Sequence, residues 1–155
     1  MNDVVDMPDF ARHLVNLASP RLGAKTLSCS DDFFAPMERI LQDGEPVFIA
    51  DKFDDHGKWM DGWESRRRRG GGFDHLVIQL GTRGIIKGVD IDTRYFTGNY
   101  PPKASIQVAD GGHSNQPGDL TWRELLSEIP LGPDSHHYFS ISDPEPATHL
   151  RLNIF

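Results

Sequence analysis

Residues 70–93 read GGGFDHLVIQLGTRGIIKGVDIDT, and this stretch decides the fold that we predict for the chain. Three glycines open it as a turn or flexible link, and residues 75–80 follow as a short, largely apolar run. Gly81 and Gly84 interrupt that run, and residues 85–93 are again rich in β-branched side chains. Short segments of this kind, bounded by glycine, are typical of β-strands. The stretch therefore predicts two strands, the second ending at an Asp-Ile-Asp motif.

The same pattern continues toward the C-terminus and predicts an all-β domain. Residues 104–109, 136–142 and 148–155 have the composition or alternation of further strands, and 15 glycines and 11 prolines separate the segments. We expect at least one helical turn over residues 120–128. Another helical turn is expected near residues 37–41, in front of a loop-like stretch. Short strands punctuated by turns predict an antiparallel β-sandwich with short helical turns.

Composition limits the possible functions. The 155 residues are enough for one domain with its own core, and 16 basic against 23 acidic residues give a net charge of -7. This charge argues against nucleic acid as a partner, although the run of four arginines at residues 66–69 could alone be interpreted as a basic signal. Cys29 is the single cysteine, and no apolar run approaches the roughly 18 residues that span a bilayer. We therefore expect a cytoplasmic protein with no membrane partner.

The first candidate binding motif is GWESRRRR at residues 62–69. In an extended segment, alternation would place Glu64, Arg66 and Arg68 on one face. A planar guanidinium group binds a carboxylate through two parallel hydrogen bonds. We therefore predict that Arg66 or Arg68 binds the carboxylate of a small substrate. The alternative is that these arginines are solvated or ion-paired within the protein.

The second candidate motif is DIDTRYFTGNY at residues 90–100. Asp90 and Asp92 share one face of the predicted strand, and two such carboxylates can supply a base, a pair of metal ligands or acceptors for ureido N–H groups. They could equally cap the following loop. Asn99 both donates and accepts hydrogen bonds, which suits a urea-like group. We expect this segment to bind the nitrogen-rich part of the substrate.

Histidines supply the remaining candidates. His136 and His137 are neighbours on a predicted strand, so their rings point to opposite faces; we expect one to be structural and assign proton transfer to His137. His149 falls on the polar face of its strand, where we expect it to be exposed. No H-x-H or H-x-x-x-H spacing occurs, so no metal site and no cofactor are predicted, although a divalent metal ion stays open.

Together with LGPDSHH at residues 131–137 and THLRLNI at residues 148–154, these motifs resemble the allantoicases, also called allantoate amidinohydrolases. The resemblance runs from about Ser30 to the last residue. It implies a jelly-roll β-sandwich like that of galactose-binding domains. Whole family members carry two related copies of this domain, and the chain resembles the N-terminal repeat. We therefore expect residues 1–29 to be a lead-in and residues 30–155 to be the repeat, which stops inside an apolar strand and lacks its closing strand.

The resemblance also implies an activity, the hydrolysis of allantoate to ureidoglycolate and urea in purine breakdown. Because the chain stops inside an apolar strand, we expect it to associate with itself as a homo-oligomer. Arg66 or Arg68 would hold the substrate carboxylate, with Asn99 at a ureido arm. The residues that would share the acid and base roles, in an order that the sequence leaves open, are Glu64, Asp90, Asp92 and His137. The alternatives are a non-catalytic ligand-binding module and an inactive structural repeat. Urea release from allantoate would distinguish these functions.

Overall fold

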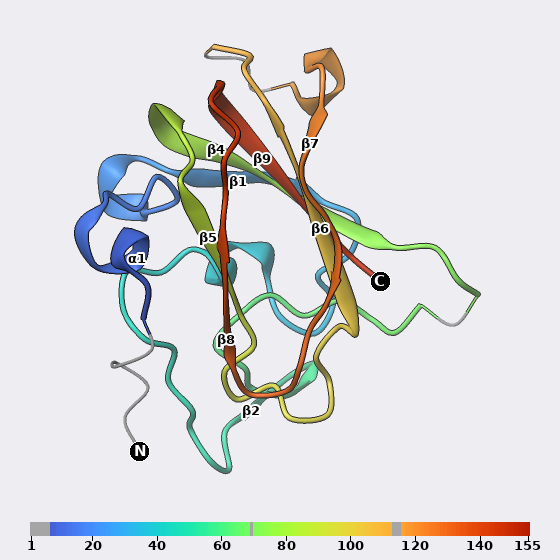
Figure 1. The fold of residues 1–155 in the computed structure, drawn as a ribbon. Helices are drawn as coiled ribbons and strands as arrows, with labels where there is room; N and C mark the ends of the chain where they lie inside the picture. The colour runs from blue at the N-terminus through green and yellow to red at the C-terminus, as the bar shows by residue number, and fades with distance from the viewer. Residues whose placement is uncertain (1–6, 69, 113–115) are drawn as a thin grey trace.

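The computed structural model describes residues 7–68, 70–112 and 116–155 and consists mostly of β-strands (Figure 1). Its helical segments are short: they are α1 (Asp9–His13), η2 (Pro20–Leu22), η3 (Met37–Ile40) and η4 (Pro117–Asp119). The expected helical turn near residues 37–41 is confirmed by η3. Within the described ranges, no helix has the length and apolar character needed to cross a membrane.

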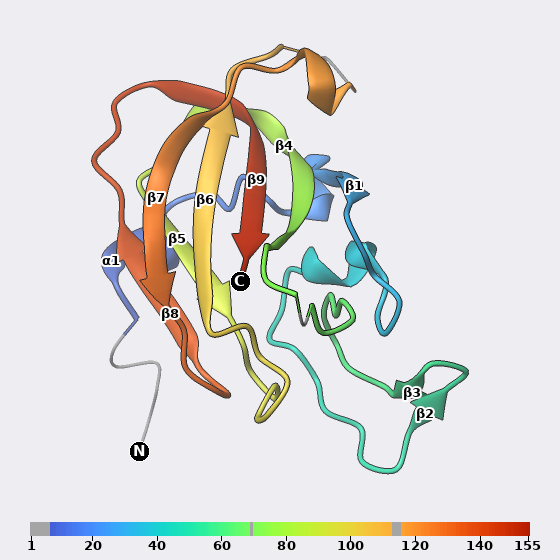
Figure 2. The same cartoon turned by 90° about the vertical axis from the view of Figure 1, so that its right-hand side faces the viewer.

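The main sheet has five antiparallel strands in the order β1-β4-β9-β6-β7, seen side by side in Figure 2. These strands are β1 (Lys25–Cys29), β4 (Asp74–Ile85), β6 (Lys103–Ala109), β7 (Arg123–Pro130) and β9 (Pro146–Ile154). The longest pairing joins β4 to β9, with Leu76 opposite Leu152. Because β1 pairs with β4, the end of the N-terminal segment forms part of this sheet.

A second, two-stranded sheet covers the apolar face of the first and completes a β-sandwich. It pairs β5 (Gly88–Asp92) with β8 (His136–Ser140) in antiparallel register. Val89 and Ile91 of β5 pack against the core residues of the main sheet. Helix α1 lies against this second sheet, where the ring centroid of Phe10 is 6.3 Å from that of Tyr138. A small hairpin of β2 (Phe53–Asp54) and β3 (Gly57–Lys58) projects away from the sandwich (Figure 2).

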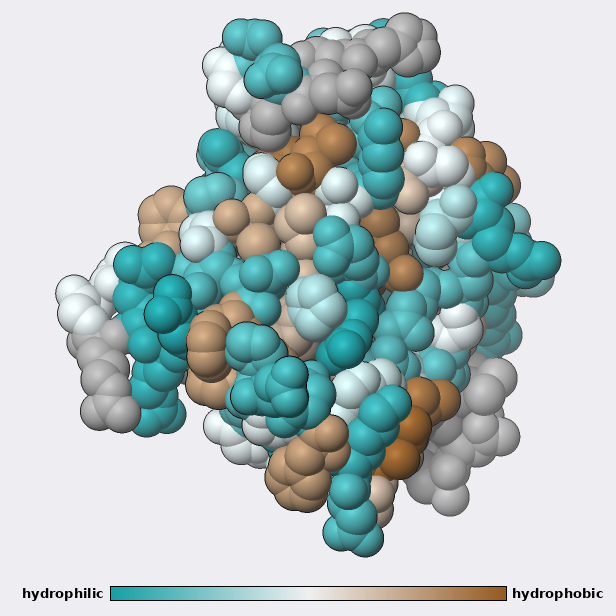
Figure 3. Space-filling view, turned by 180° about the vertical axis from the view of Figure 1, so that it is seen from behind, coloured by the Kyte–Doolittle hydropathy of each residue, from teal (hydrophilic) through white to brown (hydrophobic). Residues whose placement is uncertain are grey.

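Alternation along the strands produces the core. On β4, Leu76, Ile78 and Leu80 point to the same side and are buried, and Ile106 and Val108 of β6 join them. The other face of the main sheet is polar and includes the neighbouring side chains of Arg151 and Gln107, which hydrogen bond at 2.8 Å. Seen from behind, the surface carries several separate apolar patches between polar side chains (Figure 3).

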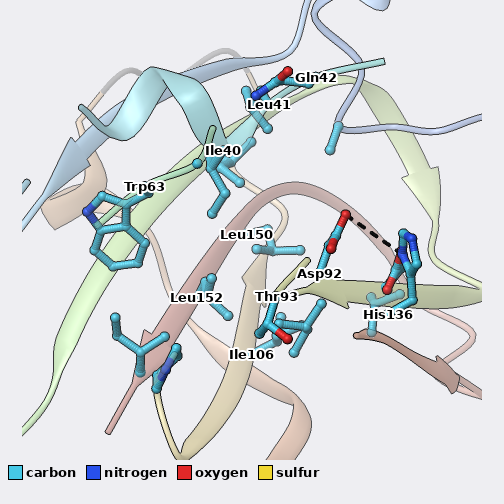
Figure 4. Close-up of a pocket in the computed structure, with 18 of the residues that line it drawn as sticks. Ile40, Leu41, Gln42, Trp63, Asp92, Thr93, Ile106, His136, Leu150 and Leu152 are labelled. Carbon is cyan, nitrogen blue, oxygen red and sulfur yellow. Dashed lines mark hydrogen bonds and ion pairs between the residues drawn. The ribbon is translucent and has the colours of Figure 1, made fainter. Parts of the chain in front are cut away.

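The space between the two sheets is only partly filled. A cavity of about 1570 Å³ lies there, and apolar side chains of the main sheet form part of its wall. Figure 4 shows Ile106, Leu150 and Leu152 on that wall, with Asp92 and His136 at its polar side. An apolar wall with charged groups beside it is the usual composition of a site for a small polar ligand.

Three sequence expectations need comment. Residues 123–130 form strand β7 instead of the expected helical turn, because pairing with β6 satisfies their backbone and overrides the local preference of Glu124-Leu125-Leu126. His149 is completely buried, not exposed. The chain at Gly111 folds over this end of the sheet, where its N–H donates to the hydroxyl of Thr148 at 2.8 Å. The fourth arginine of the run, Arg69, lies outside the described residues.

Candidate functional site

All of the predicted site residues except His137 lie on the walls of the cavity between the sheets. Three groups contribute: an acidic cluster on β5, β8 and the loop before β2; a carboxylate–amide pair; and the arginine segment at residues 66–68. The acidic cluster, under that name below, consists of Glu45, Asp90, Asp92 and His136. A single cavity therefore presents both anionic and cationic side chains.

The register of β5 and β8 builds the acidic cluster. Asp92 lies directly opposite His136, so the two side chains share one face of the small sheet. The imidazole Nδ1 of His136 is 2.6 Å from Oδ2 of Asp90 and 3.7 Å from Oδ2 of Asp92, and its Nε2 is 2.9 Å from Oε1 of Glu45. The ring of Tyr138 stacks on the imidazole with centroids 5.5 Å apart. Figure 4 shows Asp92 and His136 facing each other.

Burial and mutual charge shift the pKa values in this cluster. Burial raises the pKa of Asp90 above its usual range, although the hydrogen bond from His136 opposes the change. The pKa of Asp92 is also raised, mainly by burial. For His136, burial favours a lower pKa, but the hydrogen bond and charge of Asp90, together with Glu45 and Asp92, outweigh it and raise the pKa. The imidazole is therefore held in its charged form to higher pH than usual.

Glu64 and Asn99 form the second group. The main chain of Glu64 pairs with that of Ala35, which fixes the segment beside the cavity. The amide Nδ2 of Asn99 donates to Oε2 of Glu64 at 3.0 Å. Burial raises the pKa of Glu64, and this hydrogen bond offsets only part of the effect. The pair presents a carboxyl group with elevated proton affinity next to an amide that donates and accepts.

Two of the predicted arginines bind carboxylates of the protein itself. Arg66, whose side chain is 65% exposed, contacts Asp31, with Nη2 and Oδ1 2.8 Å apart. Arg68 contacts the buried Asp74 at the same distance. Burial alone would raise the pKa of Asp74, but Arg68 and a hydroxyl donor outweigh it and lower the pKa. Arg67 pairs with no carboxylate among the described residues, so its guanidinium is available to a ligand.

The structure gives the two neighbouring histidines different surroundings. The Nδ1 of His137 is 2.7 Å from the carbonyl oxygen of Ile91, and its Nε2 accepts a hydrogen bond from the N–H of Gly132 at 2.9 Å. Both nitrogens of His137 are thus bound to the backbone, and the ring anchors the loop before β8. His136, not His137, faces the carboxylates. Sequence reasoning placed the two rings on opposite faces, but the choice between them needed the register of β5 and β8.

Sequence reasoning also missed the loop residues of the site. Glu45 and Asp31 contact predicted site residues from segments without regular alternation, so no periodic signal marked them. Ligand atoms of Glu45, Asp92 and His136 lie within 4.8 Å of one another, close enough to surround one cation. The arrangement can therefore bind an anion at one part of the cavity and transfer protons or hold a cation at another.

Comparisons with known proteins agree on one family. The family model described as "Allantoicase repeat" matches residues 15–155. A curated relative, the "Probable allantoicase" of Ralstonia nicotianae, is 52% identical over 149 residues, which cover 96% of this chain and 44% of that protein. The crystal structure of allantoicase from Saccharomyces cerevisiae is 31% identical with a TM-score of 0.76, covering 91% of this chain and 44% of that one. The chain thus spans less than half the length of the relatives that it matches.

A more distant likeness concerns the fold alone. The family 32 carbohydrate-binding module of Streptococcus pneumoniae EndoD has a TM-score of 0.56 at 13% identity and covers 91% of this chain. The predicted jelly-roll β-sandwich is confirmed by this similarity together with the strand content of the chain. At 13% identity, the ligand of this module gives no information about the ligand of the site described above.

Proposed function

Because the chain belongs to the allantoicase family, we propose that it acts in the hydrolysis of allantoate to ureidoglycolate and urea. Allantoate carries one carboxylate and two ureido arms on a central carbon. In the reaction, the bond from that carbon to one ureido nitrogen breaks, the nitrogen gains a proton, and the oxygen of water takes its place. The protein must bind the carboxylate, supply the proton and accept the one that water loses.

The observation that carries this proposal is that the cavity brings the arginine segment, the Glu64–Asn99 pair and the acidic cluster together. An arginine suits the carboxylate, and carboxylate and amide groups suit ureido N–H and C=O groups. Arg67 is free to bind the substrate as it stands, whereas Arg66 and Arg68 would have to share their guanidinium groups with Asp31 and Asp74. We therefore add Arg67 to Arg66 and Arg68 as a binding candidate.

The acid and base roles follow from the electrostatics of the site. Glu64 has a raised pKa and can hold a proton at higher pH than an ordinary glutamate, which suits protonation of the leaving urea nitrogen. His136 takes the role first assigned to His137, because it faces the cavity with its Nδ1 fixed by Asp90. In this proposal Asp90 positions the imidazole, and Asp92 and Asn99 accept and donate hydrogen bonds at the ureido arms.

The test is urea release from allantoate by the purified chain and by its arginine variants. Replacing an arginine that binds the carboxylate should raise KM by about 30-fold, on the order of 2 kcal/mol, because that interaction exists before and during the reaction. The variants are Arg66→Ala, Arg67→Ala and Arg68→Ala. Arg83→Ala is the matched control, since Arg83 pairs with Asp110 away from the cavity and should keep the wild-type KM. An unchanged KM in all three variants would rule out binding of the substrate carboxylate by these arginines. Allantoate binding without urea release would favour a non-catalytic binding module.

The compartment is a further part of the proposal. Cys29 is the single cysteine, and burial together with neighbouring acidic side chains raises the pKa of its thiol to about 11. Such a thiol is inert toward disulfide exchange at neutral pH. A chain without a possible internal disulfide suits a reducing compartment, so we propose the cytoplasm.

A further inference from the structure

We infer that Asp134 positions, through the backbone of Tyr95, the loop that carries Asn99 on the cavity wall. This loop begins directly after Asp92 at the end of β5, and Asp134 lies in the loop before β8. Asp134 does not line the cavity itself, so it acts through residues that do. The effect on turnover rests on the proposed function, whereas the effect on the loop does not.

The backbone of Tyr95 has a conformation that its side chain disfavours. Its φ is 71°, in the left-handed region that glycine, asparagine and aspartate adopt most readily, so an aromatic residue there is strained. Oδ1 of Asp134 accepts a hydrogen bond from the main-chain N–H of Tyr95 at 2.8 Å and another from Nη1 of Arg94 at 2.8 Å. A strained backbone persists only where its surroundings impose it, and here Asp134 provides the fixed acceptor.

Further hydrogen bonds join the same two loops. The buried Thr93 donates from Oγ1 to the carbonyl oxygen of Gly132 at 2.8 Å, and its main-chain N–H donates to the carbonyl oxygen of Ser135 at 2.8 Å. The N–H of Asp134 donates to the carbonyl oxygen of Phe96 at 3.1 Å. The loop after β5 is therefore fixed to the loop before β8 at both ends of its first turn.

Two contacts transmit this position to the cavity. The ring of the buried Phe96 lies against Gly62, where a Cβ would be 3.1 Å from Cε2 of the ring. Two residues beyond Gly62 is Glu64, whose Oε2 accepts the hydrogen bond from Asn99 at 3.0 Å. If the loop lost its attachment to Asp134, Phe96 and Asn99 would both move, and the amide would separate from the carboxylate.

The pKa of Glu64 indicates whether Asn99 is in place. Burial raises this pKa, and the hydrogen bond from Asn99 partly lowers it. Loss of that hydrogen bond should therefore raise the pKa further. In the proposed reaction protonated Glu64 is the acid, so the rate falls as the pH rises through its pKa, and a higher pKa moves this decrease to higher pH.

The experiment measures the pKa of Glu64 by NMR of its side-chain carboxyl carbon, together with the pH profile of urea release. Asp134→Gly removes the acceptor but tolerates the positive φ of this position, whereas Asp134→Asn keeps an acceptor oxygen. We expect Asp134→Gly to raise the Glu64 pKa as Asn99→Ala does, and to lower kcat by about 10–100-fold. Asp134→Asn should restore the wild-type pKa and pH profile. Asp110→Gly is the matched control, because Asp110 also pairs with an arginine but lies away from the cavity.

The same Glu64 pKa in Asp134→Gly and the wild type, or an equal shift in Asp110→Gly, would overturn the inference. The double variant Asp134→Gly/Asn99→Ala should shift no further than Asn99→Ala, because both changes act through one hydrogen bond; additive shifts would contradict this. If far-UV circular dichroism shows that Asp134→Gly is unfolded, Thr93→Val must raise the pKa instead, because it removes the other side chain that joins the loops. A shifted pKa without urea release by the wild type would count against the proposed reaction and leave the positioning role intact.

Discussion

At the scale of single residues, His136 links the acidic cluster to the stability of the second sheet. The fold raises the pKa of this imidazole above its ordinary value of 6.5, so the imidazole binds a proton more tightly in the folded state than in the unfolded state. Its contribution is complete below pH 6.5 and is lost as the pH rises through the raised pKa. The chain should therefore lose melting temperature through this group as the pH rises above 6.5.

A comparison of variants isolates this effect. His75 has a pKa lowered mainly by burial and contributes the opposite slope, so the wild-type curve alone is not decisive. His136→Gln should remove the part of the pH dependence due to the acidic cluster, and the exposed His56→Gln should keep it. Thermal unfolding at half-unit pH steps provides the measurement. If the wild type and His136→Gln show parallel curves, the cluster does not hold the imidazole in its charged form.

The residues of the site differ in how far the sequence could reveal them. Alternation was enough to place Asp90 and Asp92 on one face of a strand, and the structure pairs both with the same imidazole. Which histidine meets them depends on the pairing register of two strands far apart in sequence, and a shift of one residue would reverse the answer. Glu45 comes from an irregular loop, where the sequence has no alternation of apolar and polar residues from which its position could be predicted.

At the scale of elements, the attachment of the N-terminal segment to β4 depends on a close approach at Gly81. The N–H of Gly81 donates to the carbonyl of Leu17 at 2.8 Å, and a Cβ at this position would lie 2.7 Å from Cγ of Leu22. Gly81→Ala should therefore destabilise the fold by about 1–3 kcal/mol, measured by urea denaturation. Gly98→Ala is the control, because a Cβ there meets nothing within 4 Å; similar midpoints for both variants would contradict this packing.

The elements were predicted well where burial imposes a period and poorly where it does not. The apolar alternation at Leu150, Leu152 and Ile154 and the run at residues 75–80 indicated β9 and β4 correctly. β7 is an edge strand of the main sheet and only partly buried, so its sequence is not constrained to a clean alternation. Its expected helical turn was wrong because the pairing with β6 is a tertiary effect.

At the scale of the whole molecule, the partly filled space between the sheets exposes apolar surface. The cavity wall includes side chains of β4, β6 and β9, and the outer edges of β1 and β7 have no neighbouring strand in the main sheet as described. Apolar surface and free strand edges favour association. The chain should therefore form oligomers at micromolar concentration, with a molar mass by light scattering above the 17.4 kDa of one copy. A mass of one copy at all concentrations would contradict this.

The class of fold could be predicted, but its strand order could not. Glycine and proline punctuation between short alternating segments is sufficient for a β-sandwich. The order β1-β4-β9-β6-β7 brings together segments that no local pattern connects, and the residual cavity depends on how the two sheets sit on each other.

The pairing of β5 with β8 also constrains when the acidic cluster can come into existence during folding. Asp90 and His136 are separated by 46 residues, and residue 76 of β4 pairs with residue 152 of β9. Loops of this length must close before the contacts that they bring together contribute any stability, so topologies of this kind refold on a timescale of roughly milliseconds to seconds. A collapsed chain that has not yet joined these segments has no acidic cluster. The amount of ligand bound there therefore measures only the fraction of molecules that have finished folding.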